Sequence, residues 1–172
     1  MNYADIKRVD VANGPGVRVS LFVSGCEHRC PGCFNPEAWD FGYGSPFGEE
    51  QRREILTLLD KSYIKGLSLL GGEPFHPSNQ GAVLELVKRV REAYPQKDVW
   101  CYTGYLFEDL RDSRVGEYSR ALLEGLDVLV DGPFVEAKKD LSLRFRGSSN
   151  QRIIDVPASL RMGQAVPWTE IE

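Results

Sequence analysis

Three cysteines lie within the eight residues from Cys26 to Cys33, in the spacing C-x3-C-x2-C, and Cys101 is the one further cysteine of the chain. Thiolates spaced this closely are typical of metal binding, and glycines such as Gly32 let the backbone approach a bound group. A structural zinc site usually draws four ligands from two separated pairs, and an ordinary 4Fe–4S carrier uses four cysteines. A set of three therefore predicts a 4Fe–4S cluster with one iron left without a protein ligand. An open coordination position on a metal is where substrate binds.

Other interpretations of the loop stay open. His28 would complete a Cys3His zinc knuckle, although four ligands within eight residues is cramped. The thiols would alternatively be unrelated structural residues. Cys101 lies in the apolar stretch "VWCYT" and is interpreted as a buried structural cysteine.

A second stretch, "GGEP" from Gly71 to Pro74, ends an apolar run and precedes a helical pattern. Paired glycines at such a turn allow a ligand to contact the main chain directly. By itself the motif is weak and is more typical of a plain strand-to-helix turn. Together with the cysteine loop, it is interpreted as a ligand contact.

The elements that must position these residues alternate along the chain. Apolar periodicity predicts strands over 66–70, 97–103, 127–134 and 150–156, and helices over 49–62, over 79–94 and in "LFEDLRDS" and "EYSRALLEGL". The turn "NGPG" between two strand-like runs predicts an N-terminal hairpin. This alternation favours a largely parallel sheet whose site lies at the carboxyl ends of the strands. The segments at Cys26, 71–74, 102–105 and 131–133 each follow a predicted strand, so we expect them to share one rim.

Composition fits one globular domain. The 172 residues include 42% hydrophobic and 27% charged residues, and the net charge is −4. This charge argues against general nucleic-acid binding, and no apolar run approaches the ~20 residues of a membrane span. The N-terminus lacks the features of a signal peptide, so we expect a cytoplasmic protein whose thiols stay reduced.

Several stretches, in order, carry a resemblance to a known family: "NGPGVRVSLFVSGCEHRCPGCFNPEAW", "LLGGEPFHPSN", "CYTGY", "VLVDGPFVEAKKD" and "FRGSSNQRIID". The cysteine spacing followed by GGEP resembles the radical S-adenosylmethionine (radical SAM) enzymes. Within them, the whole set resembles the activating proteins of anaerobic ribonucleoside-triphosphate reductase, which belong to the glycyl-radical-enzyme activating enzymes. The likeness covers residues 2–155. We therefore predict a radical SAM domain over 1–156 and a C-terminal tail over 157–172.

The resemblance implies an oxidoreductase with two cofactors, a 4Fe–4S cluster and S-adenosylmethionine. Cys26, Cys30 and Cys33 would hold three irons, and S-adenosylmethionine would chelate the fourth. Reductive cleavage would give methionine and a 5′-deoxyadenosyl radical, which takes a hydrogen from the C-terminal glycyl loop of the reductase. A flavodoxin-type reductant is implied by analogy. Because a peptide must enter and a closed barrel typically takes ~250 residues, we expect a partial, open βα barrel of about six mostly parallel strands.

The family's cofactor contacts transfer onto a few positions. Gly72, with Gly71 and Glu73, would hold the methionine amino end. The residue before the last cysteine is often aromatic in the superfamily, but it is Gly32 here. The adenine contact is therefore expected from the backbone of 32–34, which is Gly32, Cys33 and Phe34, and from the Phe34 ring.

Further residues have two interpretations each. Thr103, Tyr102 and Tyr105 would face the cofactor or the peptide, or pack in the core. Asp131 would reach ribose hydroxyls or the substrate loop, or form an Asp-Gly turn. Three arginines, Arg144, Arg146 and Arg152, would form a solvated edge, a docking surface or a cofactor carboxylate contact. His76 is expected to order a turn and Trp168 to pack, and no side-chain acid, base or nucleophile is expected.

Three alternative functions remain at this point. The first is an activase of another glycyl radical enzyme, such as pyruvate formate-lyase. The second is a cyclising enzyme of deazapurine synthesis. The third, from another class, is a non-catalytic zinc-binding adaptor built on the Cys3His interpretation.

Overall fold

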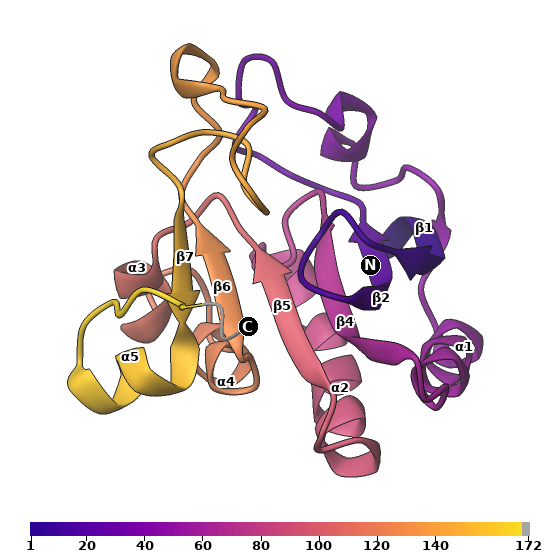
Figure 1. The fold of residues 1–172 in the computed structure, drawn as a ribbon. Coiled ribbons are helices and arrows are strands. Elements are labelled where there is room, and N and C mark those ends of the chain that lie inside the picture. The colour runs from indigo at the N-terminus through magenta and orange to yellow at the C-terminus, as the bar shows by residue number, and fades with distance from the viewer. Residues whose placement is uncertain (170–172) are drawn as a thin grey trace.

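The computed structural model describes residues 1–169. Its strands are β1 (Asn2–Asp10), β2 (Val17–Val23), β3 (Ser45–Pro46), β4 (Ile64–Gly71), β5 (Asp98–Tyr102), β6 (Val128–Asp131) and β7 (Arg152–Asp155). Its α-helices are α1 (Glu49–Leu59), α2 (Pro77–Ala93), α3 (Phe107–Arg111), α4 (Ser119–Glu124) and α5 (Val156–Met162), and two 3₁₀ turns are η1 (Pro36–Trp39) and η2 (Glu136–Lys138). Figure 1 shows these elements as one sheet with long loops beyond one end of its central strands.

The seven strands form a single open sheet in the order β3-β1-β2-β4-β5-β6-β7. Strands β2, β4, β5 and β6 run parallel, whereas β1, β3 and β7 pair antiparallel at the two sides. The α/β class and the N-terminal hairpin are confirmed. The expectation of about six mostly parallel strands is wrong at the edges. A short turn returns β1 directly against β2, and no α-helix crosses over between β6 and β7, so both pairs are antiparallel.

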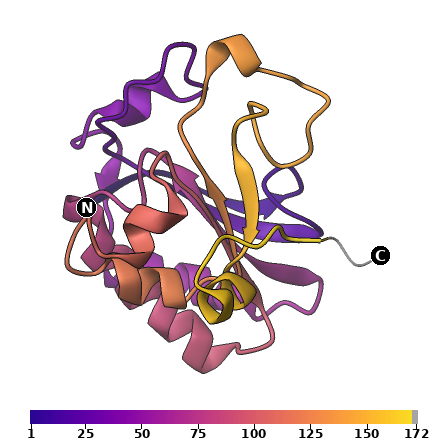
Figure 2. The same ribbon diagram turned by 90° about the vertical axis from the view of Figure 1, so that its left-hand side faces the viewer.

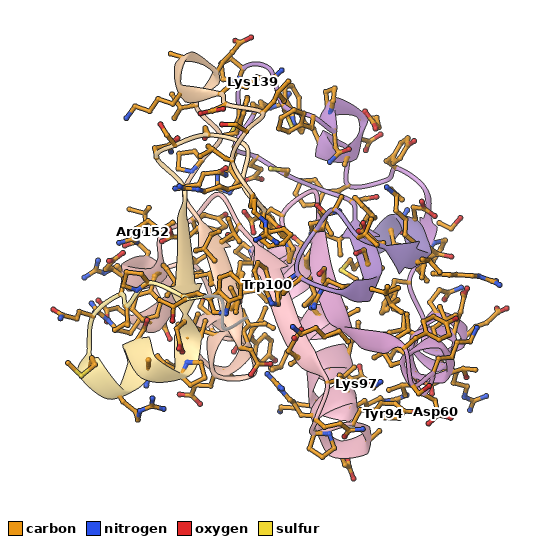
Figure 3. All side chains as sticks on the ribbon, in the orientation of Figure 1. Asp60, Tyr94, Lys97, Trp100, Lys139 and Arg152 are labelled. Carbon is orange, nitrogen blue, oxygen red and sulfur yellow. The ribbon has the colours of Figure 1, made fainter. Side chains whose placement is uncertain are left out.

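The two faces of the sheet bury different residues because side chains alternate along a strand. Val19 and Leu21 of β2 join the large core under the helices, together with Leu67 and Leu69 of β4. Trp100 of β5 lies on the opposite face, in a smaller apolar cluster. Figure 2 shows the helices gathered on one side of the sheet, and Figure 3 shows Trp100 on the face that they leave uncovered.

The tail 157–172 contains a helix that the sequence analysis missed. The Asp155 side chain accepts a hydrogen bond from the Ala158 N–H and begins α5, and Gly163 ends the helix in a left-handed conformation. The following residues return along the edge strand, and the Trp168 N–H donates to the Ile153 carbonyl at 2.9 Å. The predicted packing of Trp168 is confirmed, since its ring lies 5.0 Å from that of Trp100.

The helices predicted over 49–62 and 79–94 are confirmed as α1 and α2. Among residues 1–169, no helix combines the length and the apolar character needed to cross a membrane.

Arg18 crosses the helix-free face and ties three strands together. Its side chain is fully buried, and its Nη2 lies 2.5 Å from Oδ1 of Asp98 at the start of β5. Its Nε donates to the Ser68 hydroxyl of β4 at 2.7 Å. A buried guanidinium is tolerated only where its charge and its N–H groups are matched in this way.

We predict that Asp98→Asn destabilises the protein by about 3 kcal/mol, because it leaves the buried Arg18 charge without a counter-ion. The measurement is the free energy of unfolding by chemical denaturation. Glu124→Gln is the matched control, since it removes the carboxylate of an exposed helix pair with Arg120 and should cost no more than about 0.5 kcal/mol. Equal losses in the two variants would contradict the role given to Arg18.

Candidate functional site

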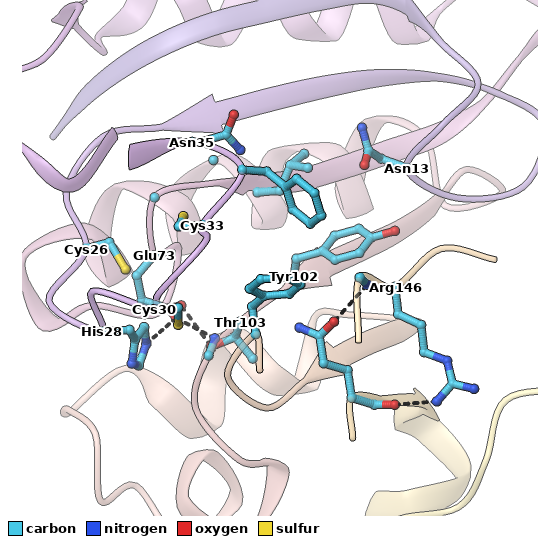
Figure 4. A pocket seen from close by; sticks show the side chains of 18 of the residues that line it. Asn13, Cys26, His28, Cys30, Cys33, Asn35, Glu73, Tyr102, Thr103 and Arg146 are labelled. Atoms are coloured by element: carbon cyan, nitrogen blue, oxygen red, sulfur yellow. Dashed lines mark hydrogen bonds and ion pairs between the residues drawn. The ribbon is translucent and has the colours of Figure 1, made fainter. Parts of the chain in front are cut away.

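A cavity of about 560 Å³ lies at the carboxyl ends of the central strands, on the face without helices, where Tyr102 and Phe145 line it. Cys26, Cys30 and Cys33 line it, and so do segments 71–73 and 102–104 (Figure 4). The structure thus brings three of the four predicted segments to one rim. The fourth, 131–133, reaches the cavity through Gly132.

The cysteine loop is held by its own backbone. The Gly25 N–H donates to the Ala38 carbonyl at 2.7 Å and the Cys26 N–H to the Trp39 carbonyl at 3.2 Å, so the start of the loop is fastened to η1. The Cys33 N–H donates to the Cys30 carbonyl at 3.1 Å, which closes a turn between these two cysteines. All three thiols are half-buried and free of disulfides.

The electrostatics of the loop suit a cationic metal group. Burial, with added repulsion from the Glu73 carboxylate and from Cys30 and Cys33, raises the pKa of Cys26 to about 11. The thiolate is the form that binds metal, and a positive group beside it would offset this cost. Across residues 1–169, no three side chains of the usual ligand types converge as ligands of a single ion. The donors fit a cluster in type and in number, with one corner left to another ligand.

Cys101 lies apart from this group. It is fully buried in the core under the helices, and burial raises its pKa well above the ordinary value. The structural interpretation of Cys101 is therefore supported by its burial and by its absence from the described lining of the cavity.

Gly71 and Gly72 are required by close packing of backbone on backbone. Gly71 has a φ of +104°, which other residues rarely adopt. A Cβ at Gly72 would lie 2.7 Å from the carbonyl oxygen of Gly25 and 2.9 Å from that of Ala38. The Gly72 N–H already donates to the Val23 carbonyl at 2.7 Å, so a ligand amino group would use carbonyl oxygens of this turn.

Glu73 is the most constrained residue of the site. Its side chain is 1% exposed, and both carboxylate oxygens accept two hydrogen bonds. Oε1 accepts from His28 Nε2 and from the Gly104 N–H, each at 2.7 Å. Oε2 accepts from the Thr103 hydroxyl at 2.8 Å and from the Phe75 N–H at 2.9 Å. The carboxylate therefore joins the cysteine loop to the ends of β4 and β5, as Figure 4 shows for His28 and Thr103.

These bonds restrict what the neighbouring side chains can do. The Glu73 carboxylate is saturated by protein donors. Its main chain is engaged as well, since its N–H donates to the Gly25 carbonyl at 2.8 Å and its carbonyl accepts from the His76 N–H at 3.1 Å and from Asn79 Nδ2 at 3.0 Å. The Thr103 hydroxyl is likewise engaged, since it also accepts from the Tyr105 N–H at 3.1 Å. The hydrogen bond to Glu73 raises the pKa of His28, whose ring packs edge-on against Tyr105 at 4.5 Å. His28 thus supports the loop, a role that the sequence analysis missed.

The structure does not bring Asp131 to the cavity. Arg152 lies directly across from it in the β6–β7 ladder and donates from Nε to Asp131 Oδ1 at 2.9 Å. Asp131 Oδ2 also accepts from the Phe107 N–H at 2.8 Å, and the side chain is buried. A contact from this carboxylate to ribose would require breaking these bonds.

Phe34 lies at the mouth of the cavity and is 57% exposed. Its ring packs 5.0 Å from that of Phe134, and Lys139 Nζ stands over it. Gly32 has a φ of +75° and lies outside the cavity lining among the described residues. The predicted adenine contact can therefore come from Cys33 and Phe34 more readily than from Gly32.

The sequence analysis also missed the far wall of the cavity. This wall is the stretch 140–147 with Gln151, which includes Leu141, Leu143 and Phe145. Apolar residues in this irregular, glycine-containing segment could have indicated a buried surface. The segment has no helical or strand periodicity, so its place in the cavity could not be predicted.

The three arginines near this wall have separate roles. Arg146 lines the cavity and donates from Nη1 to the Gln151 carbonyl at 2.6 Å. Arg152 joins Asp131 to Glu108. Arg144 stacks on Phe145, with its Cζ 4.8 Å from the ring centre. His76 caps α2 by accepting from the Ser78 N–H at 3.0 Å, which confirms that it orders this turn.

Comparison with known proteins gives a consistent result. A family model described as a 4Fe-4S single cluster domain matches residues 12–154. A Vibrio cholerae protein called anaerobic ribonucleoside-triphosphate reductase-activating protein is 47% identical over 155 residues, which cover 89% of this chain and 97% of that protein. Proteins of the same name from Escherichia coli and Haemophilus influenzae are 45% and 43% identical, with 88% and 89% of this chain and 96% and 97% of theirs covered. The chain belongs to this family of activating proteins.

The match to the 4Fe-4S domain supports an iron–sulfur cluster as a cofactor of this chain. The matched region of the 4Fe-4S domain contains the cysteine loop, the Gly71–Gly72 turn and Glu73. The family name and the cluster domain confirm the resemblance noted in the sequence, and with it an enzyme of the activating class.

We predict that Glu73→Gln destabilises the protein by about 2–3 kcal/mol and lowers its iron content. Each carboxylate oxygen accepts from a backbone N–H, of Gly104 or of Phe75, so the glutamine NH₂ group must face a donor in either orientation. Unfolding in urea and iron per chain after anaerobic reconstitution are the measurements.

Glu27→Gln is the control from the same loop, because the Glu27 side chain is 72% exposed. It should retain stability and iron. A Glu73→Gln protein as stable as this control would contradict the role assigned to the buried carboxylate.

Proposed function

We propose that this chain activates an anaerobic ribonucleoside-triphosphate reductase by generating a glycyl radical on it. The observation that carries the proposal is that three cysteine thiols and the Gly-Gly-Glu turn line one cavity in a chain of this family. Cys26, Cys30 and Cys33 would hold a 4Fe–4S cluster, and the chemistry supplied there would be one-electron reductive cleavage of S-adenosylmethionine to methionine and a 5′-deoxyadenosyl radical, which would take a hydrogen from a glycine Cα.

The residues of the chain bind and position the cofactor in this proposal. The carbonyl oxygens of Gly71 and Gly72 would accept from the methionine amino group, because the Glu73 carbonyl already accepts from the His76 N–H and from Asn79 Nδ2. Cys33 and Phe34 would contact the adenine. Glu73 keeps the loop and the turn in register through His28, and Thr103 supports that carboxylate from β5.

The same proposal includes the protein substrate and the electron donor. The C-terminal glycyl loop of the reductase would enter the cavity from its open mouth, where Phe34 and Leu141 are exposed. A flavodoxin-type protein would supply the electron, because reducing a sulfonium needs a potential at the low end of the cluster range. The cytoplasm is the expected compartment, since it keeps thiols reduced. The partial radical SAM barrel and the boundary at residue 156 stay predictions.

We predict that anaerobic protein reduced with dithionite converts S-adenosylmethionine to 5′-deoxyadenosine and gives a glycyl radical signal on added reductase. Electron paramagnetic resonance detects the radical and chromatography detects the nucleoside. Pyruvate formate-lyase in place of the reductase is the control partner and should give no signal. A signal from formate-lyase alone would favour the alternative activase, and colourless protein with one bound zinc would end the enzymatic proposal.

We predict that Cys30→Ala loses at least about 90% of the cluster absorbance near ~400 nm and both products, because two thiols cannot hold the cluster in place of three. Cys101→Ala is the matched control. It should keep the cluster and both activities, and lose about 1–2 kcal/mol of stability through the small cavity that it creates. Loss of the cluster in Cys101→Ala would overturn the assignment of the three ligands.

A further inference from the structure

Two residues that line the cavity carry a buried polar atom for which the described residues supply no hydrogen-bond partner. Among the described residues, four buried side-chain atoms lack a hydrogen bond, and two of them belong to residues that line this cavity, Trp39 Nε1 and Tyr102 Oη. Trp39 lies beside the cysteine loop, where the cofactor needs room. Tyr102 is the last residue of β5. None of the cofactor contacts proposed above would supply a hydrogen-bond partner for its hydroxyl. A buried hydroxyl without a partner costs free energy, so its retention suggests a ligand that completes it.

The Tyr102 side chain points away from the thiols of Cys26 and Cys30. Cys101, the preceding residue of β5, packs in the core under the helices, and successive side chains of a strand point to opposite faces, so Tyr102 packs with the cluster of Trp100 on the other face. Figure 4 shows the Tyr102 ring crossing the cavity with its hydroxyl directed toward Asn13 and Arg146, on the side away from Cys26 and Cys30. The cavity therefore has two ends, a cysteine end and the end around the Tyr102 hydroxyl, which we call the hairpin end.

The polar groups around the hairpin end are already fixed by the protein. The Asn13 side chain donates to Asp10 Oδ2 at 2.7 Å, which holds the turn between β1 and β2. The Gln151 amide donates to the Gly132 carbonyl at 3.1 Å and accepts from the Gly147 N–H at 2.9 Å. The buried Tyr102 hydroxyl is thus left without a hydrogen-bond partner among neighbours that are already paired. The apolar rings of Phe22 and Phe145 line the same cavity.

We infer that the hairpin end binds the main chain of the glycine-containing segment of the reductase, and that the Tyr102 hydroxyl donates a hydrogen bond to a backbone carbonyl of that segment. The inference rests on the proposed function and assigns Tyr102 as a binding residue for the protein substrate. Burial raises the pKa of Tyr102 well above its ordinary value, so the hydroxyl stays a neutral donor near pH 7.

The chemistry of the hairpin end suits a peptide better than a nucleotide. A neutral hydroxyl between aromatic and aliphatic surfaces matches an amide carbonyl, which is uncharged and flanked by apolar groups. Phosphate recognition would favour several free cationic donors. Of the lysine and the arginine that line the cavity, Arg146 donates to the Gln151 carbonyl and Lys7 Nζ lies over the Phe22 ring, 5.0 Å from its centre. The cofactor, in turn, is confined to the cysteine end by its bond to the cluster.

The test is Tyr102→Phe, which removes the hydroxyl and keeps the ring. We expect the reductase concentration that half-saturates glycyl radical formation to rise about tenfold, the value for one lost buried hydrogen bond. The concentration of S-adenosylmethionine that half-saturates 5′-deoxyadenosine formation without reductase should stay unchanged. The melting temperature should stay equal or rise, because the variant no longer buries an unsatisfied hydroxyl. Tyr63→Phe is the control, since Tyr63 is 56% exposed and precedes the amino end of β4.

The outcomes separate this inference from the proposed function. An unchanged half-saturating reductase concentration in Tyr102→Phe, with an active wild type, would overturn the inference alone. A raised half-saturating concentration of S-adenosylmethionine without reductase would also overturn it, because Tyr102 would then serve the cofactor. A wild type that cleaves S-adenosylmethionine but forms no glycyl radical on the reductase would overturn both.

Discussion

The site depends on one buried carboxylate. Glu73 is almost fully removed from water, so its charge is tolerated only because four donors surround it. These donors come from the cysteine loop, from the turn after β4 and from the turn after β5. Each segment therefore finds its place only when the others are present. This interdependence turns three loops, which would be separate features of the sequence, into one rigid wall of the cavity.

Side chains along each strand point alternately to the two faces of the sheet, so one face forms the core and the other is left for the site. Residues such as Val19 and Leu69 face the helices and form the main core. The opposite face also has apolar residues, but it carries the polar side chains of Arg18, Ser68 and Tyr102 as well. Arg18 satisfies the polar groups at one end of that face, and Asp98 balances its charge. The face thus stays ordered without helices to cover it, which leaves room for ligands above the strand ends. The sheet is open, with β3 and β7 as its two edge strands.

The sequence predicted what local spacing determines and missed what distant pairing determines. The cysteine spacing and the Gly71–Gly72 pair reflect requirements of their own backbone, so both could be interpreted directly. The environment of Asp131 could not, because its partner Arg152 is set by the register of β6 and β7. The support that His28 gives to the loop could not be predicted for the same reason, since its partner Glu73 lies 45 residues further along the chain. The antiparallel edges and the short helix α5 gave no strong periodic signal.

The two ends of the cavity have different physical tasks, and this bears on how the enzyme selects its partner. Under the proposed function, thiolates and backbone carbonyls at the cysteine end would recognise a cluster and a small cofactor, and neither depends on the sequence of the protein substrate. Selection would then come from side chains at the hairpin end and at the mouth, where Tyr102, Phe145 and the exposed Leu141 lie. A glycine segment has no side chain to recognise, so its main chain and its flanking residues must carry the specificity. Under the proposed function, a neutral hydroxyl fixed in an apolar frame would recognise a backbone carbonyl by position, and the glycine Cα that carries the hydrogen to be abstracted is bonded directly to its own carbonyl carbon.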